Sequence, residues 1–356
     1  MILFRLGDVL ADRYQLAKKI SQGGMGAVWL AEDKVLNRTV AIKTVNQNML
    51  EINDRAFKVF NDEANIGAGL LGHPNVVTVL DYGIHHVAKM EQAPFMVMEY
   101  IDGINALTFI NQTKAVIDEE TYYYISLLIA SKICMAIDYA HKKRIFHRDI
   151  KPLNVFISKY GFIKVGDFGL SRFFDEFTRT HTVSQFSSPS YSAPEQWKGE
   201  SYEEKTDIYQ LGCTLYHLFT GQRIFEKPIP ALIYAHLNEC PIPPKNFCFY
   251  MPEELSNVII EMVSKEGIDR PSLWQLNDIL AKELHKNFNI SITVDKDDYK
   301  KIDIVCEVTD ASGDSLKYGS ETIITFSDFN EVLSEALQLI LNDITTIHIT
   351  ALDEMT

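Results

Sequence analysis

The sequence predicts an α+β protein with a β-rich lobe first, a helix-rich lobe second, and a small α/β module at its C-terminal end. Three observations lead to this fold class. Short alternating apolar runs surround a glycine cluster between residues 14 and 43, as expected for antiparallel strands. From Glu119 onward, apolar residues recur at helical spacing. After about Leu284 the pattern changes to alternating segments rich in acidic residues.

The β-rich lobe is expected over residues 14–98, after an N-terminal extension at 1–13. Its strands and its one helix are predicted, in chain order, at 14–43 (strands), 54–70 (helix), 76–82 and 95–100 (strands). Residues 99–105 contain the turn-forming pair Asp102 and Gly103, so this segment is predicted to be a hinge.

The helix-rich lobe is expected over residues 106–286, with helices at 119–142 and around 206–220, 230–238 and 253–263. Polar residues interrupt its apolar runs well before the roughly 20 residues that a membrane-spanning helix needs, so no membrane span is expected. Arg5 and Asp8 interrupt the apolar N-terminus, which disfavours a secretory signal. The 5 cysteines form no C-x-x-C pair and are read as reduced thiols. A cytoplasmic protein is therefore expected.

The accessory module is expected over residues 287–356. Strand-like runs at 302–308 and 322–326 flank a turn at 311–314, Ser327 is a suitable N-cap for a following helix, and 346–352 alternates like a final strand. The module carries 14 of the 48 acidic residues and 4 of the 34 basic ones, within a net charge of −14. This acidity argues against nucleic-acid binding, which needs a basic surface.

The first chemical candidate is a glycine-rich turn at 21–28, with Ser21, Gly23, Gly24 and Gly26. Where side chains are absent, backbone N–H groups can approach phosphate oxygens, although such turns are common without that role. Downstream, Lys43 ends an apolar strand, where its ammonium group needs an anion. Glu63 on the predicted helix is one candidate for that anion.

The most informative segments are HRDIKPLN at 147–154, DFG at 167–169 and APE at 193–195. Together with the glycine loop and Lys43, they resemble the eukaryotic-type serine/threonine protein kinases, most of all the bacterial members of that family. The resemblance extends from about Tyr14 to Leu284. It implies a two-lobed protein-kinase fold and transfer of the γ-phosphate of ATP to protein serine or threonine hydroxyl groups.

The resemblance also assigns roles. It implies that Asp149 lies near the attacking hydroxyl group, that Lys151 stabilises charge on the γ-phosphate, and that Lys43 binds phosphates while paired with Glu63. Oxygen ligands for Mg²⁺, or for Mn²⁺ in its place, are expected from Asn154 and Asp167. The residues expected around adenine are Val28, Ala41, Met98, Glu99, Ile101 and Phe156. Asp207 resembles the aspartate that holds the catalytic loop, and Arg270 the arginine that pairs with Glu195.

Lys151, two residues after Asp149, is typical of serine/threonine kinases rather than tyrosine kinases. Arg148 suggests a phosphorylated activation segment over residues 170–192. The candidate acceptors are Thr178, Thr180, Thr182 and Ser184. A homodimer that phosphorylates itself in trans is a further expectation. Serine replaces a more usual glycine at Ser21 and a threonine at Ser188, with a modest effect expected on ATP affinity from the first and little from the second.

Two alternatives stay open at this point. A pseudokinase would keep the fold as a scaffold or ATP-binding module without transferring phosphate, and a small-molecule phosphotransferase of related fold would act on a different acceptor. All residues required for transfer are present, which argues against the first, and APE with its partners Asp207 and Arg270 argues against the second. The acidic module is expected to regulate the kinase or to recruit a partner.

Overall fold

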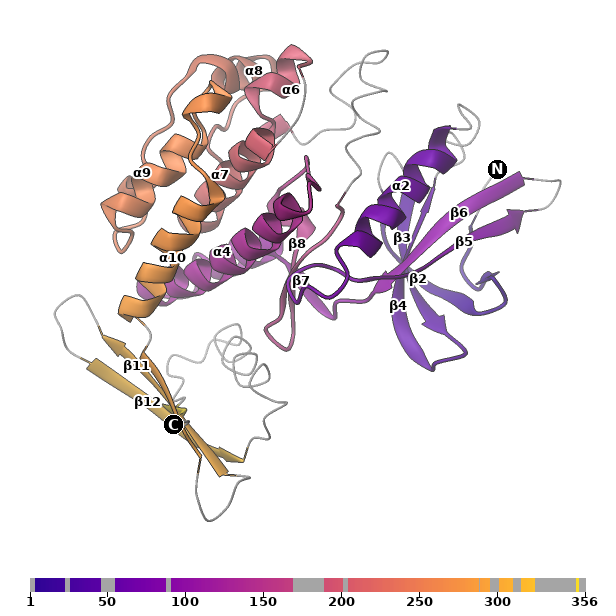
Figure 1. The fold of residues 1–356 in the computed structure, drawn as a ribbon, viewed down its shortest axis with the longest axis horizontal. Coiled ribbons are helices and arrows are strands. Elements are labelled where there is room, and N and C mark those ends of the chain that lie inside the picture. The colour runs from indigo at the N-terminus through magenta and orange to yellow at the C-terminus, as the bar shows by residue number, and fades with distance from the viewer. Residues whose placement is uncertain are drawn as a thin grey trace.

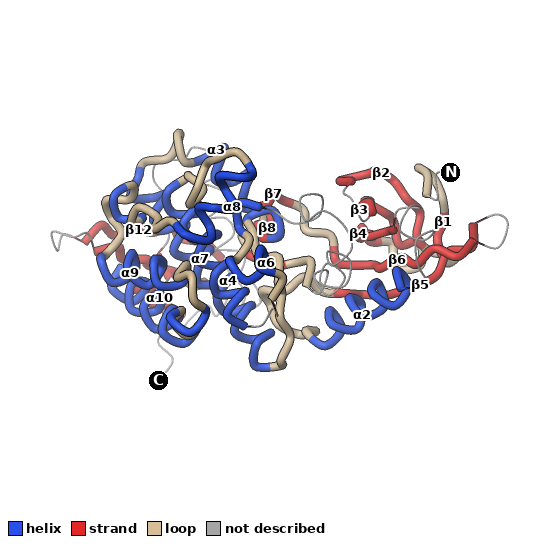
Figure 2. Tube along the Cα trace, turned by 90° about the horizontal axis from the view of Figure 1, so that it is seen from above, coloured by secondary structure: helices blue, strands red, loops and turns tan. Residues whose placement is uncertain are grey.

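The computed structural model covers the whole chain, and the main chain is described at 4–22, 26–45, 55–87, 91–168, 189–200, 204–287, 289–294, 301–309, 315–323 and 350–351. Within these ranges the protein has two lobes of different composition. Strands form most of the first, and helices form most of the second, as Figures 1 and 2 show. The predicted fold class of two lobes is confirmed.

The N-terminal lobe is a six-stranded antiparallel sheet with one helix beside it. The strand order is β1-β2-β3-β4-β6-β5. The strands are β1 Val9–Leu10, β2 Tyr14–Gln22, β3 Gly26–Asp33, β4 Arg38–Val45, β5 Val79–Val87 and β6 Glu91–Glu99, and the helix is α2 Arg55–Gly69. The predicted helix over 54–70 agrees with α2 to within one residue at each end.

The residues before Tyr14 pack onto this lobe. β1 pairs with β2, and the side chains of Phe4 and Leu10 belong to the apolar cluster on one face of the sheet. Arg13 then donates from Nε and Nη2 to the two carboxylate oxygens of buried Asp33, at 2.7 Å each. Such a bidentate pair fixes the start of β2 against the end of β3.

A short three-stranded sheet lies where the two lobes join. Its order is β7-β8-β9, with β7 Gly103–Asn105, β8 Val155–Ser158 and β9 Ile163–Val165. Gly103 allows β7 to approach β8 closely, because a Cβ atom at this position would lie 2.0 Å from the carbonyl oxygen of Ile157. The segment before β5 also bonds to β9, since Val77 N donates to Val165 O at 2.9 Å. The strand predicted over 76–82 therefore enters the main sheet only at Val79, because residues 76–78 bond to β9 and the hinge instead.

The C-terminal lobe contains α3 Ala106–Thr113, α4 Glu119–Lys142, α6 Pro194–Lys198, α7 Glu204–Thr220, α8 Ile229–Asn238, α9 Glu253–Met262 and α10 Leu273–Asn287. Asp118 caps α4 by accepting from Thr121 N at 2.9 Å, and the helix matches the prediction for 119–142. In the described part of the chain, α4 alone has the length and hydropathy of a membrane span, and 61% of its most apolar window is buried inside the protein. It is a core helix of this lobe.

The C-terminal module contains a sheet in the order β10-β11-β12, with β13 also paired to β11. The strands are β10 Asn289–Val294, β11 Lys301–Thr309, β12 Ser315–Ile323 and β13 Thr350–Ala351. β11 agrees with the strand predicted at 302–308. β12 begins seven residues before the predicted 322–326. Residues 315–321 lack the alternating apolar pattern of a strand, but they pair with β11 through their backbone. The predicted turn at 311–314 and the helix after Ser327 lie outside the described residues.

Candidate active site

The loop between α4 and β8 holds three of the predicted catalytic and metal-binding residues together. Lys151 Nζ lies 2.6 Å from Asp149 Oδ2. Asn154, in the short 3₁₀ turn Pro152–Asn154, donates from Nδ2 to Asp149 O at 2.9 Å and to Asp149 Oδ2 at 3.3 Å. The Asp149 carboxylate is thus oriented by a cation and an amide.

Helix α7 anchors this loop through Asp207, which is fully buried. One carboxylate oxygen, Oδ1, accepts from Arg148 N at 2.5 Å, and the other, Oδ2, accepts from His147 N at 2.7 Å. His141 Nε2 also contacts Oδ2, at 2.7 Å. The resemblance of Asp207 to a loop-holding aspartate therefore has a direct structural counterpart.

Two other polar residues of α7 support the same loop, and the sequence analysis did not single them out for it. Gln210 accepts from Ile150 N at 2.8 Å through Oε1 and donates to Arg148 O at 2.7 Å through Nε2. Thr214 Oγ1 donates to Ile150 O at 3.2 Å. Together with Asp207 these residues occupy positions i, i+3 and i+7, which is one face of a helix. Polar residues at that spacing in an otherwise apolar helix are the signal that would have found them.

The second part of the site is Asp167 with Lys43. Lys43 Nζ lies 2.9 Å from Asp167 Oδ1, and Lys43 is only 8% exposed. Burial has the largest single effect and raises the pKa of the Asp167 carboxyl group, but the charge and hydrogen bond of Lys43 and the smaller effects of other groups together bring the pKa below the ordinary value. Lys151 lowers this pKa further by its charge. Asp167 is therefore within the electrostatic reach of both lysines, one from each lobe, and stays ionised at neutral pH.

The residues on either side of Asp167 are also fixed. His147 Nε2 contacts the carbonyl oxygen of Gly166 at 2.9 Å, and the rings of His147 and Phe168 lie 4.5 Å apart. Gly166 itself packs against Phe156, since a Cβ atom there would lie 2.8 Å from the Phe156 ring. Of the predicted DFG segment, the structure describes 167–168.

Glu63 lies in α2, but its side chain is outside the description, so its predicted pairing with Lys43 stays a prediction. Of the predicted phosphate-binding loop, Ser21 is the second-last residue of β2 and Gly26 is the first of β3, whereas Gly23 and Gly24 lie outside the described residues. Gly26 has a second reason to be glycine. A Cβ atom at this position would lie 1.7 Å from the carbonyl oxygen of Thr44.

Four of the six residues expected around adenine lie on the neighbouring strands β3, β4 and β6. Val28 on β3 pairs with Lys43 on β4, and Ala41 on β4 pairs with Met98 on β6. Ile101 follows β6, and Phe156 lies on β8 of the other lobe. The side chain of Glu99 turns away into a pair with Lys164 on β9, at 2.6 Å from Nζ to Oε1.

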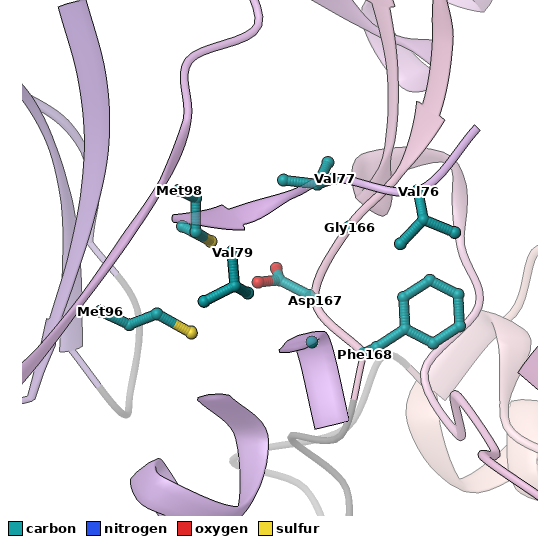
Figure 3. A pocket seen from close by; sticks show the side chains of 9 residues that line it. Val76, Val77, Val79, Met96, Met98, Gly166, Asp167 and Phe168 are labelled. Atoms are coloured by element: carbon teal, nitrogen blue, oxygen red, sulfur yellow. The ribbon is translucent and has the colours of Figure 1, made fainter. Parts of the chain in front are cut away.

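An apolar pocket is lined by residues of both lobes, among them Met98 and Asp167 (Figure 3). Met96 and Met98 lie on one side of it and Val76 and Phe168 on the other, with the carboxyl group of Asp167 between them. Gly67 of α2 also lines it. The pocket surrounds one of the predicted metal-binding carboxylates with apolar walls, which strengthens electrostatic interactions there.

An ion pair supports the start of α6. Arg270 Nη1 and Nη2 donate to Glu195 Oε1 and Oε2 at 2.7 and 2.8 Å, and Thr206 Oγ1 donates to Oε1 at 2.6 Å. Burial raises the pKa of Glu195, but Arg270 and Thr206 bring it below its ordinary value. The predicted pairing of these positions is present in the structure.

A sheet-rich lobe that presents a buried lysine, joined to a helical lobe that presents an anchored Asp-Lys-Asn loop, defines the protein kinase domain as a class. Residues 14–283 match the model of the protein kinase domain family, and the chain belongs to that family. The resemblance seen in the sequence motifs is thereby confirmed.

Proteins similar to this chain include bacterial serine/threonine-protein kinases. The chain is 35% identical to PrkC of Bacillus subtilis over 267 residues, which is 74% of this chain and 39% of that protein. It is 33% identical to PknB of Mycolicibacterium smegmatis over 266 residues, 73% of this chain and 41% of that protein. The matched region therefore spans about two fifths of the length of these relatives. The kinase domain of Mycobacterium tuberculosis PknI has a similar fold, with a TM-score of 0.59 at 25% identity over 79% of this chain and 99% of that one.

Proposed function

We propose that this chain is a serine/threonine protein kinase that transfers the γ-phosphate of Mg-ATP to hydroxyl groups of protein substrates. The observation that carries the proposal is the placement of Asp149 between Lys151 and Asn154, with Asp167 and Lys43 close enough to act electrostatically on one another. Phosphoryl transfer depends mainly on positioning and on stabilisation of charge, and this arrangement supplies both.

Each residue of the loop has a task in this proposal. Asp149 orients the acceptor hydroxyl group and takes up its proton. Lys151, whose ammonium group lies 2.6 Å from the Asp149 carboxylate, stabilises negative charge on the phosphate. Lys43 binds the phosphates of the nucleotide, with Glu63 as its proposed partner on α2, while Asp167 holds the lysine in the cleft at 2.9 Å.

The family uses ATP with a divalent metal, and the oxygen atoms of Asn154 and Asp167 suit one. The pKa of Asp167 lies below its ordinary value, so the carboxylate is ionised. The amide nitrogen of Asn154 donates to Asp149, so its amide oxygen is the atom proposed to bind the cation. Oxygen donors of this kind favour Mg²⁺, or Mn²⁺ in its place. When bound, the metal neutralises phosphate charge.

The nucleotide is proposed to lie under the turn that contains Ser21, Gly23, Gly24 and Gly26, with adenine at the hinge. Its rings would contact Val28, Ala41, Met98 and Phe156, and the backbone of Glu99 and Ile101 would bond to its edge. The pairing of Ala41 with Met98 supports this placement, because it brings strand β4 and the start of the hinge side by side.

The acceptor class is proposed from Lys151 and from the names of the relatives, which are serine/threonine-protein kinases. Protein serine and threonine residues are the expected substrates. Autophosphorylation is proposed at Thr178, Thr180, Thr182 or Ser184, within a homodimer that acts in trans; all four residues lie outside the described part of the chain. A cytoplasmic location is part of the proposal. The net charge of −14 argues against nucleic-acid partners, and the acidic residues 287–356 are proposed to regulate the kinase or to recruit a partner.

The decisive experiment compares the full chain with its Asp149→Asn and Lys43→Met variants in γ-labelled ATP and Mg²⁺, with a generic basic protein as acceptor. Label is expected on serine or threonine in the wild-type reaction, with at least a hundredfold loss in either variant, an order of magnitude typical of removing a group that acts in the transition state. Mass spectrometry then locates the phosphate. A wild-type protein that binds ATP without transferring phosphate would support a scaffold, and label on small hydroxyl compounds alone would support a small-molecule phosphotransferase.

A further inference from the structure

An ion pair behind the proposed adenine site connects parts of the chain that are far apart in sequence. Lys164 Nζ on β9 lies 2.6 Å from Glu99 Oε1 at the end of β6. The two side chains are 15% and 26% exposed, so water screens the pair only in part. Thr78 N donates to the same Glu99 oxygen at 2.7 Å, and Glu99 N donates back to Thr78 O at 3.0 Å.

This contact joins three segments. Glu99 begins the hinge, Thr78 belongs to the segment that leads from α2 into β5, and Lys164 lies on the strand that leads to Asp167. The backbone is tied in the same place, because Val77 N donates to Val165 O at 2.9 Å. The ion pair thus adds a side-chain link between the hinge and β9 beside this backbone bond.

Asp167 does not depend on this ion pair alone. Its carboxyl group is held by Lys43 at 2.9 Å, and the preceding carbonyl group of Gly166 is held by His147 at 2.9 Å. The catalytic loop is anchored separately by Asp207. The groups that would act in the chemical step thus keep their supports when Lys164 is changed, whereas the Glu99 side chain loses its cation.

We propose that Lys164 and Glu99 form a positioning pair that sets the hinge backbone for nucleotide binding, without either side chain contacting the reacting atoms. The inference rests on the proposed use of ATP. Because Glu99 lies next to Met98 and two residues before Ile101, a displacement of its backbone moves the hydrogen-bonding groups proposed to meet adenine. The pair therefore affects the affinity for ATP more than the rate of phosphate transfer.

The test uses Lys164→Met, which keeps the apolar stem of the side chain, together with Glu99→Gln, Lys164→Arg and the charge-reversed double variant Lys164→Glu/Glu99→Lys. The matched control is Lys227→Met, which removes a lysine paired at 2.6 Å with Glu239 on the surface of the other lobe. For each protein, the assays measure KM for ATP, kcat, the Kd for Mg-ATP by calorimetry, and Tm.

Lys164→Met and Glu99→Gln are each expected to raise KM and Kd for ATP about three- to tenfold, the range that corresponds to one hydrogen bond of typical net strength, because water partly screens the pair. The value of kcat is expected to change by less than about twofold. Lys164→Arg and the charge-reversed variant are expected to recover at least half of the lost affinity, and Lys227→Met is expected to match the wild type. Recovery by charge reversal separates positioning from a general loss of packing.

Unchanged KM and Kd in both single variants would overturn the inference, as would an equal loss of affinity in the charge-reversed variant. The proposed function fails in a different way, by an absence of phosphate transfer from the wild-type protein. If the wild type binds Mg-ATP but does not transfer phosphate, the Kd values still decide the role of the pair. If it does not bind Mg-ATP, both proposals fail.

Discussion

Replacing Asp207 with asparagine removes one carboxylate oxygen from the support of residues 147–154, the loop that carries the proposed catalytic residue Asp149. In the wild-type structure Oδ1 accepts from Arg148 N, while Oδ2 accepts from His147 N and contacts His141 Nε2. An asparagine that keeps its oxygen at the Oδ2 position places an NH₂ group against Arg148 N, so two donors face each other. In the opposite orientation the NH₂ group stands at the Oδ2 position, so His147 N and His141 Nε2 lose their acceptor.

The expected cost follows from these contacts. The unsatisfied N–H of Arg148 costs about 1–3 kcal/mol because the site is buried, and each of the two remaining bonds loses about 1 kcal/mol when its acceptor becomes neutral. The sum is about 3–5 kcal/mol of unfolding free energy. At about 2–4 °C per kcal/mol for a domain of this size, Tm is expected to fall by roughly 6–20 °C.

The loss is also expected in activity, because the loop that carries Asp149 loses its anchor. Below the Tm of the variant, kcat should fall at least about tenfold while KM for ATP changes little, since misplacement of catalytic groups by about 1 Å can cost two orders of magnitude. Circular dichroism melts and steady-state kinetics measure the two effects. The control is Asp138→Asn on α4, which removes an exposed pair with Lys142 at 2.6 Å and should cost less than about 0.5 kcal/mol. A Tm within about 2 °C of the wild type and a kcat within twofold would refute the importance of the three contacts to Asp207.

Three further results are expected. Gly67→Ala should lower Tm and activity, because its Cβ atom would lie 2.3 Å from Val79 Cγ2 and the overpacking cost of about 1–3 kcal/mol exceeds the gain of about 1 kcal/mol in helix propensity. Adding Val79→Ala should restore Tm and activity, and a single variant with wild-type Tm would contradict the prediction. Burial, followed by the charge of Lys265, lowers the pKa of His236 to about 3. Below about pH 6.5 the imidazole therefore stays neutral in the folded protein, whereas the same group takes up a proton in the unfolded chain. The contribution of His236 to the free energy of unfolding is thus present above that pH and is lost as the pH falls toward about 3. His236→Gln should remove this pH dependence, which amounts to about 2 kcal/mol at pH 5 and is measured by urea unfolding between pH 6.5 and 4. Chelation by EDTA should abolish phosphate transfer and excess Mg²⁺ should restore it, with Tm of the nucleotide-free protein unchanged; transfer that persists in EDTA would exclude the proposed role of Asn154 and Asp167.

Much of the fold was predictable because its main helices carry a clear pattern. The helix predicted over 119–142 has both ends correct, since its apolar spacing is regular, and the structure adds that Asp118 caps its start. The contiguous motif at 147–154 likewise placed Asp149, Lys151 and Asn154 in one loop, where the structure finds them bonded to one another. Local pattern and local contact coincide in these segments.

The contacts that support the site were harder to predict, because they join residues distant in sequence. Lys164 reads as an outward-facing lysine on an alternating strand, and nothing near it in sequence indicates Glu99, 65 residues away. His141 lies in the last turn of α4, where the helix dipole favours basic residues. That interaction is enough to explain a histidine there, so the sequence did not indicate its contact with Asp207. The roles of the predicted nucleotide and metal ligands stay predictions for the experiments above.

The backbone at two positions of the proposed site explains why these distant supports are needed. Arg148 and Asp167 both adopt left-handed conformations, with φ of 66° and 62°, which side-chain-bearing residues rarely adopt. Such a conformation costs of order 1–3 kcal/mol and persists only when its surroundings hold it. Asp207 holds the first through a bond to its N–H, and Lys43 holds the second through its carboxylate. The first support comes from within the helical lobe and the second from the sheet of the other lobe. The position of Asp167 therefore depends on how the lobes are assembled, whereas Asp149 is secured by one lobe alone.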